Sequence, residues 1–220
     1  LKCLKTKVLI DVSFIDCNAT DCYSNCGGFA YFECLTGTIT LNHVVCNNCT
    51  AGYGGAIYTN KNYQRVILKI YAPVYLIIEE NSSFTNCSAK YYGGFAYIDS
   101  PMTYIGWSDD DDEFIKVSNC SAGKYGGGMY INENQVSVSQ IEFENCKATY
   151  GGGIYVNGKA TKLEYDKFNG CVATKKGSAI YSDYQINWND IWINGQKIDP
   201  PKDENLMFQY TTSLCEKNAI

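Results

Sequence analysis

The sequence predicts an all-β fold, a right-handed parallel β-helix (solenoid) of about six to seven coils. Three observations predict it. A phrase of Cys, Ala, paired Gly and Tyr recurs along the chain, short segments rich in Ile, Val, Tyr and Phe surround it, and no apolar pattern of helical period is long enough for a helix. The right hand follows from the general rule for parallel crossover connections.

The recurring phrase reads C-K-A-T-Y-G-G-G-I-Y at 146–155, and its six copies end in tyrosines at Tyr31, Tyr58, Tyr97, Tyr130, Tyr155 and Tyr181. Their spacings are 27, 39, 33, 25 and 26 residues, so the shortest spacings define one coil and the longest contain insertions. We place these insertions at about 60–80 and 99–115 within a β-helix of residues 1–199, and we assign 200–220 to a C-terminal cap or strap.

A sharp corner is predicted just before each repeat Cys, where the residue is Asp16, Asn48, Asn86, Asn119, Asn145 or Gly170. Asn, Asp and Gly are the residues that tolerate a left-handed backbone. The repeat Cys and the Ala two positions later share one strand face, which we place inward. The predicted cysteine ladder, one residue per coil, is Cys17, Cys49, Cys87, Cys120, Cys146 and Cys171. Buried thiols and disulfides between coils both remain open for it.

Six further cysteines lie outside this ladder. Four of them cluster around the first two coils and are predicted to form disulfides of undetermined pairing: Cys22, Cys26, Cys34 and Cys46. Cys3 and Cys215 lie at opposite ends of the chain and are candidates for bonds between chains. Together with the glycosylation sequons, these cysteines predict the secretory pathway and an extracellular or cell-surface location.

Five N-x-[ST] sequons occur. Asn18 and Asn81 lie away from the corner and are the predicted glycan sites of a glycoprotein. The other three, Asn48, Asn86 and Asn119, occupy the corner, where we expect the side chain to turn into the stack and bond backbone groups. An Asn ladder of that kind would leave no room for a glycan.

The net charge of −5, with one His, argues against nucleic acid or an anionic membrane as partner. No apolar run reaches the ~18 residues that a membrane span needs. The chain does not begin with Met, so we expect it to be a piece of a longer protein. No cofactor is predicted. The acidic run Asp109, Asp110, Asp111, Asp112 and Glu113 is interpreted as a solvated loop, with a calcium site as the alternative.

The motif F-x-x-C-x-A followed by G-G-A-I resembles the passenger repeats of the chlamydial polymorphic outer membrane proteins, which carry F-x-x-N and G-G-A-I. It is also similar to the wider pectin-lyase-like β-helix group. The resemblance covers about residues 8–190, with one departure, because Cys stands here where that family has Asn. It implies a secreted surface or adhesin-like solenoid and does not imply a reaction.

We therefore expect a non-catalytic structural or adhesive solenoid that assembles with itself into a fibre or surface coat, or binds another surface protein. The alternative is a carbohydrate-binding module whose outward tyrosine row contacts glycans. A polysaccharide lyase or hydrolase is the third hypothesis. It lacks support because no repeated position brings acids or bases to adjacent coils, Asp99, Asp166 and Asp183 are isolated in sequence, and His43 has no evident nucleophile partner.

Overall fold

The computed structural model describes residues 4–8, 12–15, 17–34, 37–60, 74–79, 82–100, 103–106 and 113–198. Every regular element in these ranges is a β-strand, and the strands form four sheets, which we call A to D. Sheet A contains β1 (Leu4–Val8), β4 (Ala30–Cys34), β8 (Ile57–Asn60), β12 (Ala96–Asp99), β16 (Met129–Ile131), β20 (Ile154–Val156) and β24 (Ile180–Ser182). Sheet B contains β2 (Val12–Ile15), β5 (Gly37–Asn42), β9 (Val74–Ile78), β13 (Tyr104–Ile105), β17 (Ser137–Ser139), β21 (Lys162–Glu164) and β25 (Asn187–Asn189).

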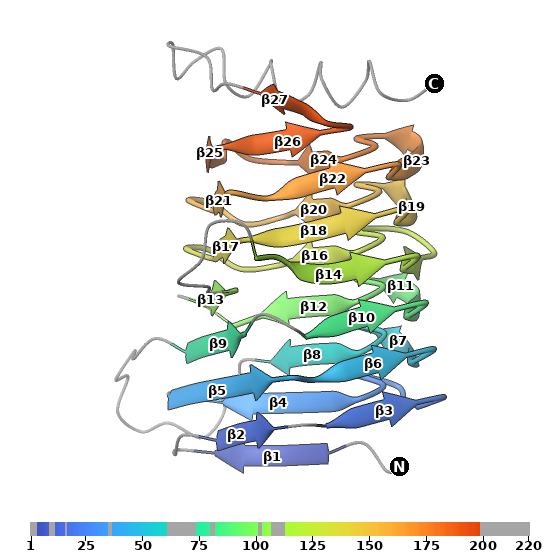
Figure 1. The fold of residues 1–220 in the computed structure, drawn as a ribbon, viewed down its shortest axis with the longest axis vertical. Helices are drawn as coiled ribbons and strands as arrows, with labels where there is room; N and C mark the ends of the chain where they lie inside the picture. The colour runs from blue at the N-terminus through green and yellow to red at the C-terminus, as the bar shows by residue number, and fades with distance from the viewer. Residues whose placement is uncertain are drawn as a thin grey trace.

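The other two sheets complete each circuit of the chain. Sheet C contains β3 (Asn18–Thr20), β6 (Val45–Asn47), β10 (Ser83–Thr85), β14 (Ile115–Ser118), β18 (Ile141–Glu144), β22 (Lys167–Asn169), β26 (Ile191–Ile193) and β27 (Gln196–Ile198). Sheet D contains β7 (Thr50–Tyr53), β11 (Ser88–Tyr92), β15 (Ser121–Ala122), β19 (Lys147–Tyr150) and β23 (Val172–Lys176). From β4 to β26 the chain visits sheets A, B, C and D in that order, and each circuit lies beside the previous one (Figure 1).

The strand pairing is parallel throughout the four sheets except at the C-terminal end of sheet C, where β27 runs antiparallel to β26. The predicted all-β class with stacked parallel strands is therefore confirmed. The ranges 60–80 and 99–115, predicted to hold insertions, contain β9 and β13, which are ordinary strands of sheet B. The predicted cap or strap at 200–220 lies outside the described residues.

The corner between sheets C and D has the predicted left-handed backbone. The φ angles are +56° at Asn48, +55° at Asn86, +53° at Asn119 and Asn145, and +60° at Gly170. L-residues other than Asn and Asp adopt this conformation at a cost, which explains the residue choice. The chain therefore turns at one equivalent residue in each coil.

The predicted position of the first corner and its ladder cysteine is wrong. Asn18 pairs with Val45, so Cys17 lies opposite Val44, whereas Tyr23 pairs with Thr50 and places Cys22 opposite Cys49. The left-handed residue of this coil is Asp21, with φ +53°. The segments 21–31 and 48–58 have the same length and align position by position without an insertion. In this alignment Cys26 occupies the position of Tyr53 in the next coil. The ladder in the structure is Cys22, Cys49, Cys87, Cys120, Cys146 and Cys171.

The interior is filled by columns of apolar side chains, one column for each register position. In sheet C, Phe84, Val117, Phe143 and Phe168 succeed one another along the stack and are almost fully buried. The sheet A positions flanking the repeat tyrosine also point inward, as predicted, and their side chains are buried: Ile57, Thr59, Ala96, Ile98, Met129, Ile131, Ile154 and Val156. Burial of these columns supplies the main driving force for stacking the coils.

Candidate functional site

The six repeat tyrosines form a continuous stack on the outer side of sheet A. They occupy one register position, and the centroids of successive rings lie 5.2, 4.8, 5.1, 5.3 and 5.2 Å apart. Each ring therefore covers the face of its neighbour. The outward direction that the sequence predicted is correct, but the ring faces are used in contacts between coils.

A second row of tyrosines, which the sequence analysis missed, covers the first row. Tyr53, Tyr92, Tyr125 and Tyr150 follow one another at the end of sheet D. The centroid distance between Tyr125 and Tyr155 is 4.5 Å. As a result, Tyr97, Tyr130 and Tyr155 are only 9, 6 and 7% exposed. The signal was present in the sequence, because an aromatic residue immediately precedes the glycine pair in these four copies.

The tyrosine hydroxyls meet a row of Asn and Asp residues at the end of the sheet A strands. Tyr130 donates its hydroxyl proton to Asn132 Oδ1 at 3.2 Å, and Tyr155 donates to Asp183. The row is linked to itself, since Asn132 Nδ2 donates to Asp99 Oδ1 at 3.0 Å and Asn157 Nδ2 donates to Asn132 Oδ1 at 3.0 Å. These hydrogen bonds tie each coil to the next at its surface.

Burial raises the pKa of four of the stacked tyrosines, Tyr58, Tyr97, Tyr130 and Tyr155, that of Tyr130 to about 12. The neutral phenol is thus favoured in the folded protein. This contribution to stability is fully present below the usual Tyr pKa of ~10 and is lost as pH rises toward the folded value. We expect absorbance at 295 nm to show these four rings ionising only well above pH ~10, together with alkaline unfolding. A single titration near pH ~10 with the fold intact would contradict the stacking.

The corner asparagines do not turn into the stack as predicted. Asn48, Asn86 and Asn119 are exposed. Asn48 Nδ2 donates to Asp21 Oδ1 of the preceding coil, and Asn86 Nδ2 donates to Asn47 Oδ1 at 3.2 Å. The left-handed backbone directs these side chains outward, so their bonds link side chains on the surface. Of the two predicted glycan sites, Asn18 is exposed in β3 and Asn81 lies outside the described residues.

Five of the six ladder cysteines are buried, and Cys171 is half-buried. Cys49, Cys87, Cys120 and Cys146 are fully buried, and Cys120 Sγ donates to the Phe84 carbonyl of the preceding coil at 3.5 Å. Burial raises the pKa of the Cys120 thiol, so the reactive thiolate is disfavoured. All six ladder residues, together with Cys17 and Cys46, are free thiols. The disulfides predicted for Cys22 and Cys46 are therefore absent.

The remaining cysteine predictions stay untested by the structure. Cys26 is half-buried at the end of the first coil. The side chain of Cys34 is not described, although its backbone belongs to β4. Cys3 and Cys215 lie outside the described residues.

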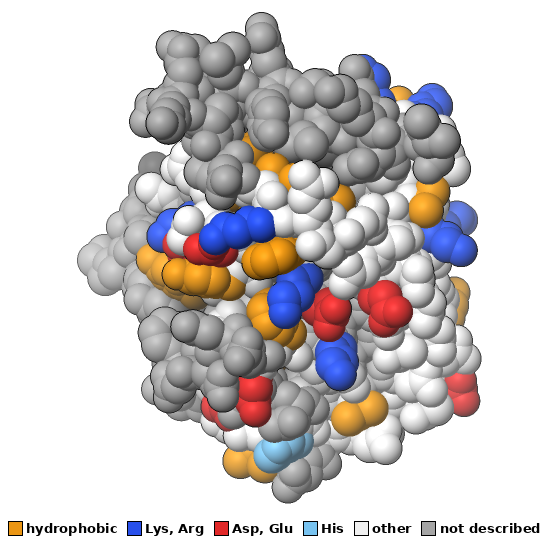
Figure 2. Space-filling view, turned by 45° about the horizontal axis from the view of Figure 1, so that its top comes forward, with side chains coloured by type: hydrophobic (Ala, Val, Ile, Leu, Met, Phe, Trp, Pro, Cys, Tyr) orange, Lys and Arg blue, Asp and Glu red, His pale blue; other side chains and the backbone are white. Residues whose placement is uncertain are grey.

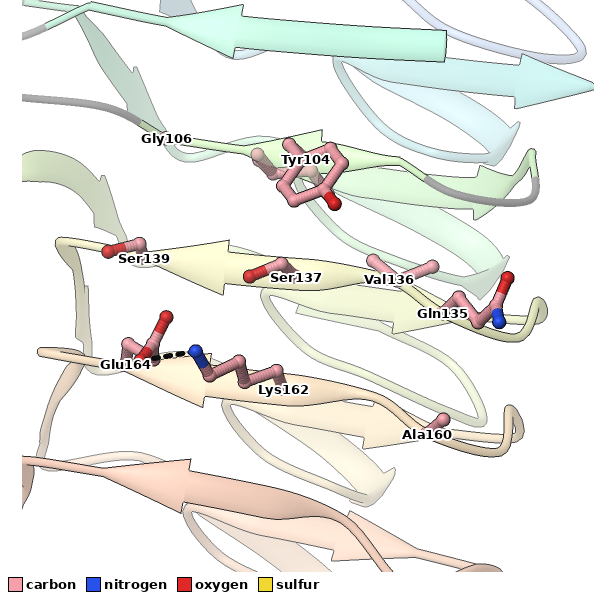
Figure 3. Close-up of a pocket in the computed structure, with 10 residues that line it drawn as sticks. Tyr104, Gly106, Gln135, Val136, Ser137, Ser139, Ala160, Lys162 and Glu164 are labelled. Atoms are coloured by element: carbon pink, nitrogen blue, oxygen red, sulfur yellow. Dashed lines mark ion pairs between the residues drawn. The ribbon is translucent and has the colours of Figure 1, made fainter. Parts of the chain in front are cut away.

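A groove of about 510 Å³ runs along β17 on the outer side of sheet B (Figure 3). Ser137 and Ser139 form its floor, the ring of Tyr104 lies on one side, and the ion pair of Lys162 and Glu164 lies on the other with an N–O distance of 2.8 Å. The Tyr104 residue is 51% exposed. An exposed ring beside hydroxyl groups can contact a sugar, whereas Glu164, the one carboxylate of the lining, is neutralised by Lys162.

The isolated acids do not meet in the fold. Asp99 and Asp183 belong to the same row of sheet A but are separated by three coils, which is roughly 14 Å at the usual strand spacing. Paired catalytic carboxylates of glycosidases lie about 5–10 Å apart. Asp166 is fully buried on sheet C, on another side of the molecule. His43 is an exposed residue of the left-handed turn before sheet C, with φ +50°.

Asp166 is a buried carboxyl group between Ile141 and Ile191, in a mostly apolar column that also contains Ser82. Its Oδ1 accepts a hydrogen bond from the Ile141 backbone N–H at 3.0 Å, and its Oδ2 has no partner. Burial raises the pKa of this carboxyl group well above its usual range. In the same column, the hydroxyl oxygen of buried Ser82 accepts a hydrogen bond from the Val44 backbone N–H at 3.1 Å. Ser82 therefore satisfies the equivalent backbone group without leaving a second oxygen unpartnered.

We expect Asp166→Ser to stabilise the protein at pH 7 by about 1–3 kcal/mol, since it keeps an acceptor for Ile141 and removes the unpartnered oxygen. Because burial raises the pKa of Asp166 in the folded protein, this carboxyl group leaves the stability of the wild type undiminished below the unfolded Asp pKa of ~3.9. Above that pH the wild type loses stability, and the loss grows until the pH reaches the folded pKa. The advantage of Asp166→Ser should therefore shrink at pH 4 in urea unfolding. An equal difference at both pH values would show that Asp166 does not titrate in this way.

No cluster of potential metal ligands occurs among the residues that the structure describes. The acidic run proposed as a calcium site cannot be placed, because 109–112 fall outside them and Glu113 is exposed at their border. Within the same ranges, no helix has the length and apolar character needed to span a membrane.

Comparison with protein family models, with curated proteins and with solved structures gave no match to this chain. The resemblance to the chlamydial repeats therefore rests on the quoted motifs alone.

Proposed function

We propose that this chain is a right-handed parallel β-helix with a non-catalytic structural or adhesive role at a cell surface or outside the cell, where it assembles with copies of itself. The observation that carries the proposal is that the repeated residues make their contacts with neighbouring coils. The cysteines, the tyrosines and the terminal Asn/Asp row all bond or pack against their equivalents in neighbouring coils. These repeated side chains stabilise the stack of coils, and few of them remain available for a catalytic site.

The ends of the sheets support end-to-end association. At the N-terminal end, β1, β2 and β3 are the first strands of sheets A, B and C, and none has an outer neighbour among the described strands. Exposed strand edges pair with other chains unless they are covered. At the other end, Asn194 and Gly195, with φ of +49° and +77°, turn the chain so that β27 continues sheet C in the antiparallel direction. The two ends are therefore unlike, which favours a head-to-tail arrangement.

Light scattering of the natively isolated protein, with and without reductant, tests this proposal. We expect a large, regular assembly. If reductant dissociates it, Cys3→Ser and Cys215→Ser should do the same, whereas Cys17→Ser, which changes a half-buried cysteine of the first coil, should not. A monomer under both conditions would rule out self-assembly as the main role.

Carbohydrate binding is the second candidate, and the groove on sheet B favours it over the tyrosine row. The row buries its ring faces, whereas Tyr104 presents a half-exposed ring above Ser137. We expect a glycan array to detect binding that Tyr104→Ala abolishes. Tyr23→Ala, which removes a 77% exposed ring elsewhere, is the matched control. Equal binding by both variants would exclude the groove as the sugar site.

A further inference from the structure

Charge is distributed unevenly around this molecule. In four successive coils, the segment from the repeat Cys through sheet D to the residue after the repeat Tyr contains no Asp or Glu; these segments are 87–98, 120–131, 146–156 and 171–182. They contain five lysines, which are Lys90, Lys124, Lys147, Lys175 and Lys176. Since the chain carries a net charge of −5, removing these five positive charges leaves −10 for all other residues.

The sheet pairing brings the lysines to one surface. The strands β11, β15, β19 and β23 are consecutive neighbours in sheet D, and all five lysines on or beside them are exposed. Lys90 to Lys175 spans three strand spacings, or roughly 14 Å. We call the surface formed by Lys90, Lys124, Lys147 and Lys175 the lysine face.

Aromatic rings lie between these ammonium groups. Lys90 Nζ and Lys124 Nζ lie 5.2 and 5.9 Å from the centroid of the Tyr91 ring, and Lys175 Nζ lies 5.5 Å from that of Tyr150. A cation held over a ring keeps its charge and its exposure to solvent. The lysine face therefore combines fixed positive charges with a flat apolar surface.

On sheets B and C, lysines lie beside carboxylates. On sheet C, Lys116, Glu142 and Lys167 alternate in one register column. Figure 2 shows Lys and Asp or Glu side chains intermixed over this face. On sheet B, Lys162 pairs with Glu164, and beside β26 Lys197 pairs with Asp190. Among the described strands of sheet D, by contrast, no carboxylate is present to balance the lysines.

We propose that the lysine face binds an acidic polysaccharide, a chain that carries sulfate or carboxylate groups along its length. Clustered lysines attract polyanions electrostatically, and such patches serve heparin-like ligands. A sugar ring can also rest on Tyr91 while its anionic groups meet Lys90 and Lys124. A duplex nucleic acid or an anionic membrane is wider than one sheet and would meet the negative remainder of the surface within a Debye length of ~8 Å.

Retention on immobilised heparin, with elution by NaCl, tests the proposal on the whole chain. We expect the wild type to be retained at low salt, and the double variant Lys124→Gln/Lys175→Gln to bind on the order of tenfold more weakly. The control is Lys116→Gln/Lys167→Gln, which makes the same change in net charge on sheet C and should bind as the wild type does. Circular dichroism of both variants verifies that these surface substitutions leave the fold intact.

Two outcomes would overturn the proposal directly: no retention of the wild type at low salt, or equal weakening in both double variants, which would reduce the effect to net charge. Polygalacturonate and dextran sulfate, used as soluble competitors, distinguish carboxylate from sulfate recognition. Tighter binding to duplex DNA or to phosphatidylserine vesicles than to either competitor would assign the lysine face to another class of partner. The result is independent of self-assembly, because retention is compared between variants of the same assembly state.

Discussion

Gly127→Ala will destabilise the folded protein by about 3 kcal/mol or more, since an added methyl group has no space between two coils. A Cβ at this position would lie 2.2 Å from the carbonyl oxygen of Gly152 and 2.5 Å from the backbone nitrogen of Lys147. Both atoms belong to the backbone of the next coil, and Gly127 also donates its N–H to the Gly151 carbonyl at 2.9 Å. Relief of the clash would break the parallel pairing on both sides.

The measurement is thermal unfolding by circular dichroism, in which a loss of this size lowers Tm by about 6–12 °C for a chain of this length. Gly195→Ala is the control. It has the left-handed φ of +77° but no atom within 4 Å of the added Cβ, so it incurs only backbone strain of about 1–2 kcal/mol. If Gly127→Ala melted at or above the temperature of Gly195→Ala, the close approach of the coils would be disproved.

Phe143→Ala will remove about 3–5 kcal/mol of the free energy of unfolding, because it empties a fully buried position in the column of sheet C. The Phe143 ring stacks on Phe168 with centroids 5.1 Å apart and planes 6° apart. It also occupies the space that a side chain at Gly128 would need. The surrounding backbone is held by neighbouring coils, so the cavity cannot collapse.

Urea unfolding measures this loss as a lower midpoint with little change in slope. Phe114→Ala is the matched control, because Phe114 is half-buried and its ring contacts Lys167 Nζ at a centroid distance of 3.6 Å. Truncation there should cost about 1 kcal/mol. Similar losses in the two variants would mean that the column of sheet C contributes no more than a surface contact.

The sequence analysis failed in the first coil, where the start of the repeat motif could be aligned at two positions. At 17–19, C-N-A matches the start of the repeat, yet the hydrogen-bonded register places Cys22 in the ladder. Counting back from the glycine pair would have found Cys22, since that spacing is constant between 22–31 and 49–58. Motif identity is a weaker guide than spacing here, because the register of parallel strands fixes every side chain of a coil together.

The orientation of polar and aromatic side chains was also beyond the sequence. The corner residues were correctly predicted to be left-handed, but Asn48 and Asn86 bond outward. The tyrosine row was correctly placed outside sheet A, but its burial by Tyr92 and Tyr125 depends on the packing of sheet D against it. The contacts of Tyr92 with Tyr130 and of Tyr125 with Tyr155 join residues 38 and 30 positions apart, so the aromatic residue before each glycine pair does not by itself reveal which ring it covers.

By itself, the sequence determined the all-β class, the recurrence of one unit per coil, the left-handed corners and the inward columns beside the repeat tyrosines. These features follow from local backbone preference and from the two-residue alternation of strands. Only the tertiary structure decided that Cys22 opens the ladder, that Tyr97, Tyr130 and Tyr155 are covered, and that the lysines of four coils share one face. The physical reason is that register, burial and charge clustering arise between coils, where the stacking of strands brings distant residues together.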